Sequence, residues 1–426
     1  MTLREPGYRD RLIDPIIDRD LRVFGAVSLE GPKWCGKTWT CLNHSESAFY
    51  LMDEASDFAN RRLAELDPAA ALDGRRPRLL DEWQEVPALW DAVRFRVDRT
   101  ASKGCFCLTG STKPRGDGPR HSGTGRIVSR RMRPMSLAES GQSSGTARLE
   151  TLLAGGRLRP ERSNASLEDV LGWMCAGGWP GVIGLDPDEA QALARSYVDH
   201  LANSDMAEAS GVRRDPARTR AFLRSLARHT ATPVRVPTLR RDMMESWGES
   251  ATDLTIRRYL DDLARLYTLE EVPAWQGQLR SRAPLRKTPK RMLADPSLAV
   301  AALGADPASL RADLNTAGFI FEAMCLRDLF VYAEVLGASL SYYRDEDGLE
   351  ADAIITLADG TWGAVEVKLG HAQVDQAAAS LKRLAAKMAH PGRPAPAMLA
   401  VIVGVAGVAE TRPDGVHVVP IDKLGP

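Results

Sequence analysis

The first third of the chain alternates short apolar runs with polar, charge-rich segments. Three runs lie at Val23–Glu30, Pro77–Trp83 and Cys105–Thr112, and each has the length of one buried strand. A glycine-rich turn follows the first run, and after it comes a mixed polar and apolar segment that is able to form a helix. The pattern predicts strands of an α/β sheet with polar residues where the strands end.

The middle of the chain is predicted to be mainly helical as far as about residue 230. After a Gly-, Ser- and Thr-rich stretch at 140–165, Ser166 and Asp169 have the spacing of a capping box that begins a helix. Two further helical patterns begin at Pro237 and Thr255, and the second carries its apolar residues on one side. Those apolar residues are Ile256, Leu260 and Leu263.

The last part of the chain predicts a β-hairpin between helices. Two strand-like runs, Gly348–Leu357 and Thr361–Lys368, are joined by a three-residue loop that ends in Gly360. The neighbouring elements are a helix over Phe319–Leu329, an amphipathic helix over Ala377–Lys387 and a buried strand over Met398–Val405.

The register of this hairpin follows from its loop. A three-residue loop of this type pairs Leu357 with Thr361. Because opposite residues of antiparallel strands share a face, counting back along both strands places Asp352 opposite Glu366. Lys368 lies two residues further on and therefore on the same face. One hairpin thus presents two carboxylates and one ammonium together.

Composition limits the class of protein. The chain has 426 residues, 44% hydrophobic and 26% charged, which is too long for one small module and too apolar for a disordered chain. Lys plus Arg and Asp plus Glu both number 56, so any basic surface must be local. The sequence has no signal peptide and no run of 18 apolar residues, which predicts a cytoplasmic protein without a membrane partner. Its six cysteines fit reduced thiols, and their spacing does not favour zinc.

The glycine-rich turn has the GxxxxGK[ST] pattern between a strand and a helix. It predicts a site for ATP with Mg²⁺, because glycine backbone N–H groups can wrap phosphates. Lys37 would reach the β- and γ-phosphates, and the Thr38 hydroxyl would bind Mg²⁺. The residues predicted to bind the nucleotide are Gly31, Pro32, Lys33, Trp34, Cys35, Gly36, Lys37 and Thr38.

The other two apolar runs end in residues that suit phosphate chemistry. The second ends at Asp81 and Glu82, where we expect Asp81 to hold Mg²⁺ and Glu82 to act as the general base for water. An acidic turn in solvent is the alternative. The third ends at small hydroxylated residues, including Thr109 and Ser111, one of which could orient the attacking water.

Together, the EGPKWCGKT, LLDEW, LTGS and RMRPMSLAES stretches resemble the AAA-type ATPases of AAA family 14, which carry a C-terminal domain of unknown function. The resemblance implies an ASCE-type P-loop core with Ser111 or Thr109 as the sensor. It also makes Arg126, which precedes the strand leading to the Pro134–Glu139 segment, the candidate phosphate-sensing arginine. Arg126 would act in its own chain or on a neighbouring subunit of a homo-oligomer. Alternatively, the arginines of this segment form a solvated basic face.

The two helical patterns in the middle resemble a winged helix-turn-helix, with the wing over Leu266–Trp275 and beyond. Such a module predicts contact with DNA, and the basic run Arg280–Arg291 favours it. A lid or a protein-docking surface is the alternative. The side chains expected to face outward are Arg257, Arg258 and Tyr259 on the second helix and Arg280 and Arg282 in the wing.

The C-terminal hairpin resembles the core of PD-(D/E)XK nucleases, although Ala351 stands before Asp352. In that pattern Asp352 and Glu366 bind a metal ion that activates water, and Lys368 stabilises charge. The resemblance also makes Glu322, on the preceding helix, a metal ligand. The alternative is an exposed ion pair between Glu366 and Lys368 that has no chemical role.

These features predict three domains. They are an AAA-type P-loop ATPase at 1–150, a helical region at 151–292 with a winged helix at about 231–282, and a restriction-endonuclease-like α/β domain at 293–426. The leading hypothesis is an ATP-hydrolysing protein whose Mg²⁺-dependent nuclease domain acts on DNA. The alternative is a nucleotide-gated regulatory switch in which the nuclease-like domain is inactive and serves recognition.

Overall fold

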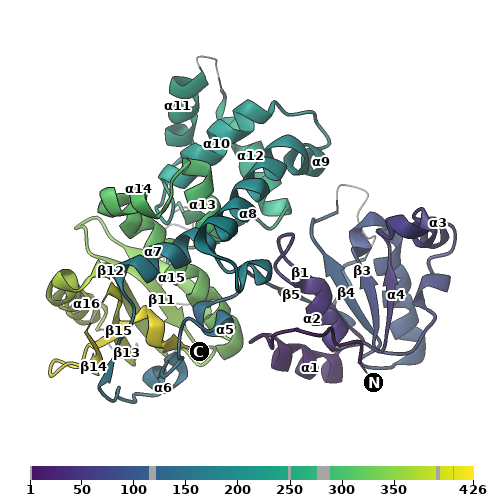
Figure 1. Ribbon diagram of the computed structural model, residues 1–426. Helices are drawn as coiled ribbons and strands as arrows, with labels where there is room; N and C mark the ends of the chain where they lie inside the picture. Colours follow the sequence, from purple (N-terminus) through teal and green to yellow (C-terminus); the bar gives the residue numbers. More distant parts are fainter. Residues whose placement is uncertain (1, 115–120, 248–250, 276–287, 390–393, 406) are drawn as a thin grey trace. The chain divides into compact units, whose positions relative to one another are not determined.

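The computed structural model describes residues 2–114, 121–247, 251–275, 288–389, 394–405 and 407–426 (Figure 1). Contacts along the chain define two compact units. The first contains the residues up to Pro134 together with Asp262–Thr268, and the second contains Met135–Asp261 together with Leu269–Pro426.

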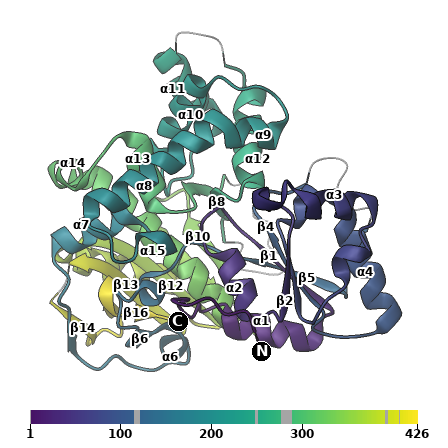
Figure 2. The same cartoon turned by 45° about the vertical axis from the view of Figure 1, so that its right-hand side comes forward.

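The first unit is built on one parallel sheet, visible in Figure 2. Its strands are β1 (Ala26–Glu30), β2 (Ser47–Tyr50), β3 (Arg78–Asp81), β4 (Phe106–Gly110) and β5 (Ile127–Arg131), in the spatial order β2-β3-β4-β1-β5. The three runs expected to be strands are therefore confirmed as β1, β3 and β4. Because all the strand pairs are parallel, the carboxyl ends of the strands meet at one edge of the sheet.

Helices pack around this sheet. They are α1 (Asp14–Val23), α2 (Lys37–Asn43), α3 (Ala59–Leu66) and α4 (Ala88–Thr100). The core between α4 and the sheet includes Trp83 and Trp90, whose ring centroids lie 4.8 Å apart. The short Asp262–Thr268 segment belongs to this unit through Tyr267, whose hydroxyl donates to Glu30 Oε2 at 2.8 Å.

The second unit begins with short elements and continues into helices. The capping box that was expected before the first long helix is confirmed, because Ser166 and Asp169 cap α7 reciprocally. The helices before the C-terminal sheet are α5 (Leu137–Ser140), α6 (Leu149–Leu153), α7 (Leu167–Ala176), α8 (Pro187–His200), α9 (Met206–Ser210), α10 (Pro216–Arg228), α11 (Val236–Trp247), α12 (Asp253–Arg265), α13 (Pro296–Leu303) and α14 (Pro307–Ala312). An antiparallel pair, β8 (Leu269–Val272) and β9 (Lys290–Leu293), follows α12.

The C-terminal sheet has seven strands in the order β10-β11-β12-β13-β15-β14-β7. Their bounds are β7 (Glu161–Arg162), β10 (Ser339–Arg344), β11 (Glu350–Thr356), β12 (Trp362–Gly370), β13 (Met398–Val405), β14 (Val408–Thr411) and β15 (His417–Pro420). The helices α15 (Leu314–Leu336) and α16 (Val374–Met388) both pack against β12. The helix, hairpin, helix and strand expected here are all present.

The end of the region that we expected to belong to the ATPase domain, and the Gly-, Ser- and Thr-rich stretch after it, instead contribute to the second unit. Residues from Met135 onward group with that unit. Within the segment, β6 (Ala147–Arg148) pairs in parallel with β16 (Leu424–Gly425), and β7 pairs with β14 at the sheet edge. Backbone hydrogen bonds to strands far along the chain cannot be inferred from the segment's Gly- and Ser-rich composition.

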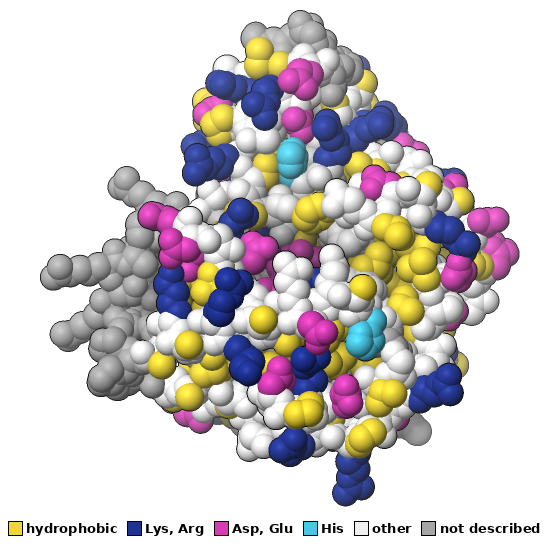
Figure 3. Space-filling model, turned by 90° about the vertical axis from the view of Figure 1, so that its left-hand side faces the viewer, with side chains coloured by type: hydrophobic (Ala, Val, Ile, Leu, Met, Phe, Trp, Pro, Cys, Tyr) yellow, Lys and Arg dark blue, Asp and Glu magenta, His cyan; other side chains and the backbone are white. Residues whose placement is uncertain are grey.

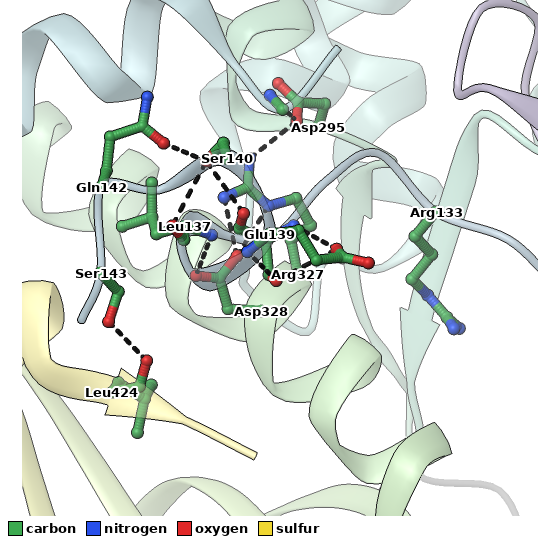
Figure 4. A network of polar contacts seen from close by, with 12 residues as sticks. Arg133, Leu137, Glu139, Ser140, Gln142, Ser143, Asp295, Arg327, Asp328 and Leu424 are labelled. Carbon is green, nitrogen blue, oxygen red and sulfur yellow. Dashed lines mark hydrogen bonds and ion pairs between the residues drawn. The ribbon is translucent and has the colours of Figure 1, made fainter. Parts of the chain in front are cut away.

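A buried polar network holds this segment in place (Figure 4). The Arg327 guanidinium on α15 is almost fully buried and lies 2.9 Å from Asp295 Oδ2 and 2.7 Å from Asp328 Oδ1. Asp328 also accepts from the backbone N–H of Leu137, and Asp295 from that of Gly178. The Gly177–Pro180 turn packs closely against this segment, since a Cβ at Gly178 would lie 2.0 Å from the Met135 carbonyl oxygen.

We predict that Arg327→Met destabilises the second unit strongly. The substitution leaves two buried carboxylates without a cation, and removing one partner of a buried pair typically costs about 3–5 kcal/mol. Chemical denaturation followed by circular dichroism measures this loss. Arg311→Met is the matched control, because Arg311 forms an exposed ion pair with Glu168 worth less than about 1 kcal/mol. Equal stability of the two variants would contradict the prediction.

Candidate functional site: a nucleotide site and a buried carboxylate cluster

The glycine-rich turn forms a loop between β1 and α2, and all eight predicted nucleotide-binding residues lie in this loop or in the first turn of α2. Lys37 is buried, and its Nζ donates to the Pro32 carbonyl oxygen at 2.9 Å. Gly36 has φ +102°, which disfavours a side chain, and a Cβ at Gly31 would lie 2.2 Å from the Met132 carbonyl oxygen. The loop therefore requires glycine at both positions.

The edge of the sheet joins this loop to the carboxylate of Asp81. The hydroxyls of Thr38 and Thr109 donate to the same oxygen, Asp81 Oδ1, at 2.8 and 2.7 Å. Burial raises the pKa of Asp81 above its ordinary value. A hydroxyl and a carboxylate oxygen this close together are hard donors of the kind that Mg²⁺ prefers, so the donor set fits that ion.

Glu82 lies beside this group in an uncommon backbone conformation, with φ +58°. Its N–H donates to Thr109 Oγ1 at 2.9 Å, and its carboxylate accepts from Ser111 Oγ at 2.7 Å. Gln84 also donates to this carboxylate and was not singled out from the sequence. A left-handed conformation at a residue other than glycine costs about 1–3 kcal/mol, and such strain often accompanies function.

Arg126 lies at the opposite end of the strands. Its carbonyl oxygen accepts from the N–H groups of Gly25 and Ala26, at the start of β1, whereas the phosphate loop follows the end of β1. Five residues at about 3.3 Å each separate those ends. The guanidinium instead pairs with Asp98 at 2.6 Å. The prediction that Arg126 senses phosphate within its own chain is therefore wrong, because strand register places it far from the loop. A role on a neighbouring subunit stays a prediction.

A second polar group, which we did not predict from the sequence, contacts α2 next to the phosphate loop. The two ring nitrogens of His44 lie 2.8 Å from Asp14 Oδ1 and 2.9 Å from Asp18 Oδ1. The Tyr8 hydroxyl lies within hydrogen-bonding distance of Asp14 and of Thr40 on α2. Burial alone would lower the pKa of His44, but the hydrogen bond to Asp14 and the charges of Asp14 and Asp18 outweigh it and raise the pKa.

We predict a pH dependence from this group. A raised pKa in the folded state means that His44 stabilises the fold fully below its unfolded pKa of about 6.5, and that this contribution is lost as the pH rises through the folded pKa. The difference in the free energy of unfolding between wild type and His44→Gln should be largest near pH 6 and should shrink by about pH 9. Its size at pH 6 should be on the order of 1 kcal/mol. A stability difference between the two proteins that does not change with pH would contradict the raised pKa of His44.

The hairpin register at the C-terminal site is as predicted. Ala353 pairs with Val365, which places Asp352 opposite Glu366, and the loop is closed by the Leu357 N–H donating to the Thr361 carbonyl oxygen at 2.8 Å. Lys368 Nζ donates to Glu366 Oε2 at 2.8 Å.

Glu322 on α15 joins this group through a residue that we did not predict. Lys290 Nζ, at the start of β9, lies 2.5 Å from Glu322 Oε1 and 3.0 Å from Asp352 Oδ1. Lys290 belongs to the basic run that we expected to favour contact with DNA, but its side chain is buried, with an exposed fraction of 9%. The correction has a physical cause, because strand pairing with β8 carries this end of the run inward.

These carboxylates do not form a ready metal site. Among the residues that the structure describes, no three His, Cys, Asp or Glu side chains are placed to hold a metal ion. The set Glu322, Asp352 and Glu366, predicted to bind metal, is instead paired with two ammonium groups. Burial and then the charge of Asp352 raise the pKa of Glu322 to about 8 and that of Glu366 to about 7.

An open pocket of about 710 Å³ adjoins this carboxylate cluster. Glu322 and Lys368 line it, and Asn315 and Gln373 add polar groups to a mainly apolar wall. The apolar contribution comes from residues such as Phe319, Val367 and Leu369. Solvent and small ions therefore have access to one side of the cluster.

The burial of the middle helices differs at one residue from what the sequence predicts. Ile256, Leu260 and Leu263 are buried as expected, and Arg257 and Arg258 are exposed. Tyr259 is buried, not outward-facing, because its ring packs 4.9 Å from that of Phe222 and beneath the guanidinium of Arg214. The wing residues Arg280 and Arg282 lie outside the described residues.

The surface view shows how charge is distributed. On the face in Figure 3, positive and negative side chains are interspersed among the described residues and form no continuous basic field there. All six cysteines are buried free thiols. In the described part of the chain, no helix combines the length and apolar character needed to cross a membrane.

The sheet order, the phosphate loop and the Asp81 site define the first unit as a P-loop ATPase core. Comparison with family models agrees: an AAA domain matches residues 24–141. Two domains of unknown function, DUF8612 and DUF4143, match residues 167–309 and 317–424. The chain thus contains a region similar to an AAA domain and a C-terminal region that matches a domain of unknown function.

The chain is also similar to two mycobacterial proteins and to several solved structures. Uncharacterized protein Rv2008c of Mycobacterium tuberculosis and Mb2031c of Mycobacterium bovis are each 26% identical over 349 residues, covering 81% of this chain and 70% of theirs. The Walker-type ATPase PABY2304 of Pyrococcus abyssi has a TM-score of 0.44 at 14% identity, covering 71% of this chain and 97% of its own. The replication initiator DnaA, bound to AMPPCP and single-stranded DNA, has a TM-score of 0.28 at 12% identity, with coverage of 61% and 89%.

Proposed function

We propose that the first unit binds ATP with Mg²⁺ and hydrolyses it at the carboxyl edge of its sheet. The observation that supports this proposal is the hydrogen-bonded chain Thr38–Asp81–Thr109–Glu82–Ser111, which joins the phosphate loop to a strained carboxylate. A carboxylate held in this way beside a phosphate loop suits activation of a water molecule.

Each residue has a distinct task in this proposal. Lys37 would exchange its bond to the Pro32 carbonyl for the β- and γ-phosphates, and Thr38 and Asp81 would hold Mg²⁺. When bound, Mg²⁺ would neutralise negative charge on the phosphates. Glu82 accepts a proton from the attacking water, and Ser111 keeps the carboxylate oriented toward the phosphates. Thr109 ties Asp81 to the Glu82 backbone, so that both carboxylates are positioned together.

We predict that Glu82→Gln lowers the rate of ATP hydrolysis by about 10²–10⁴-fold and preserves ATP binding, because the amide cannot accept the proton. Lys37→Ala should lose binding as well. A phosphate-release assay and binding of a fluorescent ATP analogue separate the two effects.

The matched control is Glu85→Gln, a neighbouring carboxylate that pairs with Arg61. This variant should hydrolyse ATP at the wild-type rate. Normal turnover by Glu82→Gln would remove Glu82 from the role of base and leave nucleotide binding alone as the function of this site.

For the second unit, the carboxylate cluster favours the recognition role over the nuclease. Mg²⁺-dependent cleavage of DNA would need Asp352 and Glu366 to bind metal, with Lys368 beside the scissile phosphate. The lysines Lys290 and Lys368 already pair with the three carboxylates. We therefore propose a nucleotide-gated switch in which the nuclease-like C-terminal domain is catalytically inactive and the second unit serves to recognise a partner. DNA is the candidate partner, through Arg257 and Arg258 of the winged-helix-like region.

We predict that the full chain binds duplex DNA at low salt and does not cleave it. Single-stranded, duplex and branched DNA would be incubated with Mg²⁺ or Mn²⁺, with and without ATP, using wild type and Asp352→Ala. Cleavage that disappears in Asp352→Ala would establish the nuclease instead. Binding should weaken in Arg257→Ala/Arg258→Ala, with a salt slope lower by about one per lost phosphate contact, but should persist in the exposed α10 control Arg224→Ala.

A further inference from the structure

The position of Lys290 is fixed from several directions. Its backbone pairs with Val272 in the β8–β9 ladder, so the start of the side chain cannot shift without breaking that pairing. Its ammonium lies between Glu322 on α15 and Asp352 on β11, and 5.7 Å from the centre of the Tyr342 ring. Three separate elements therefore hold one positive charge in a buried place.

The ammonium occupies the position that a metal ion would need. A cation shared by Glu322 and Asp352 must contact one oxygen from each, and Lys290 Nζ already lies within 3.0 Å of both oxygens. A divalent ion at that point would lie against a like charge in a site of low dielectric, which is strongly unfavourable. The other oxygen of Asp352 accepts from the Val367 N–H at 2.9 Å, which further reduces its availability.

The second lysine does not have the same effect. Lys368 contacts only Glu366 among these carboxylates and is less buried, with an exposed fraction of 26% against 9% for Lys290. Lys368 also lines the open pocket, together with Glu322. Access from solvent to the cluster is therefore present, and Lys290 is the cation that lies between the oxygens of Glu322 and Asp352.

We propose that Lys290 is a built-in cation of the C-terminal cluster, which keeps divalent metal out of Glu322, Asp352 and Glu366. Removing the charge of Lys290 by substitution converts the cluster into a divalent-cation site. This inference deepens the recognition role proposed for the second unit and is independent of ATP hydrolysis. The residue that would exclude metal therefore lies outside the hairpin that carries Asp352, Glu366 and Lys368.

The test measures metal binding, not activity. Mn²⁺ binding to the full chain without nucleotide would be followed by electron paramagnetic resonance, in an Asp81→Asn background that removes the metal position of the ATPase site. The chain with Lys290 intact should show no bound ion at the C-terminal cluster. Lys290→Met should bind about one Mn²⁺ per chain, and Lys290→Met/Asp352→Asn should lose it. Lys368→Met is the matched control and should remain metal-free.

Thermal unfolding provides an independent measurement. Lys290→Met should unfold at a lower temperature than its parent, because it buries uncompensated carboxylates, and Mn²⁺ should restore the midpoint in this variant alone. Lys290→Gln serves as a second variant if the methionine chain does not fold.

Two results would overturn the proposal. The first is that the chain with Lys290 intact binds Mn²⁺ and that the Asp352→Asn substitution abolishes this binding; this result needs no Lys290 variant. The other is a folded Lys290→Met or Lys290→Gln chain that binds none. Neither readout depends on DNA: cleavage assays decide whether the domain is a nuclease, and metal binding decides what Lys290 does.

Discussion

The second unit depends on one buried guanidinium. Arg327 neutralises Asp295 and Asp328, and those carboxylates in turn accept backbone N–H groups from Gly178 and Leu137. Four stretches of chain that are remote in sequence are therefore linked, directly or through a carboxylate, to the charge of Arg327. A buried ion pair is expensive to assemble, but once assembled it tolerates only a narrow geometry. This is consistent with the absence of space for a Cβ at Gly178.

The two polar sites of the molecule use lysine in opposite ways. In the first unit, Lys37 bonds to a backbone carbonyl, which it can leave when a more negative partner arrives. In the second unit, Lys290 bonds to the carboxylates of Glu322 and Asp352, which hold it far more strongly. The same residue type therefore leaves one site ready for a ligand and closes the other.

Local spacing explains what could be predicted from the sequence. The phosphate loop, its flanking strand and helix, and the hairpin register all follow from short stretches, and counting from a single loop was enough to place Asp352 opposite Glu366. The errors share a different cause. Tyr259 was expected to face solvent and Lys290 to belong to a basic run that favours contact with DNA, but both are buried against elements remote in sequence. Arg126 was misplaced because the parallel register of β5 against β1 puts it at the start of the strands, whereas the phosphate loop follows the end of β1.

The pairing of β6 with β16 has a consequence for how the chain is made. The strand Leu424–Gly425 pairs with residues 147–148, which leave the ribosome much earlier. These early residues must wait for their partner until almost all of the described chain has been synthesised. Contacts of such long sequence separation slow folding and prolong the exposure of unpaired strands. The second unit should therefore be the part of the protein that relies most on chaperones during synthesis.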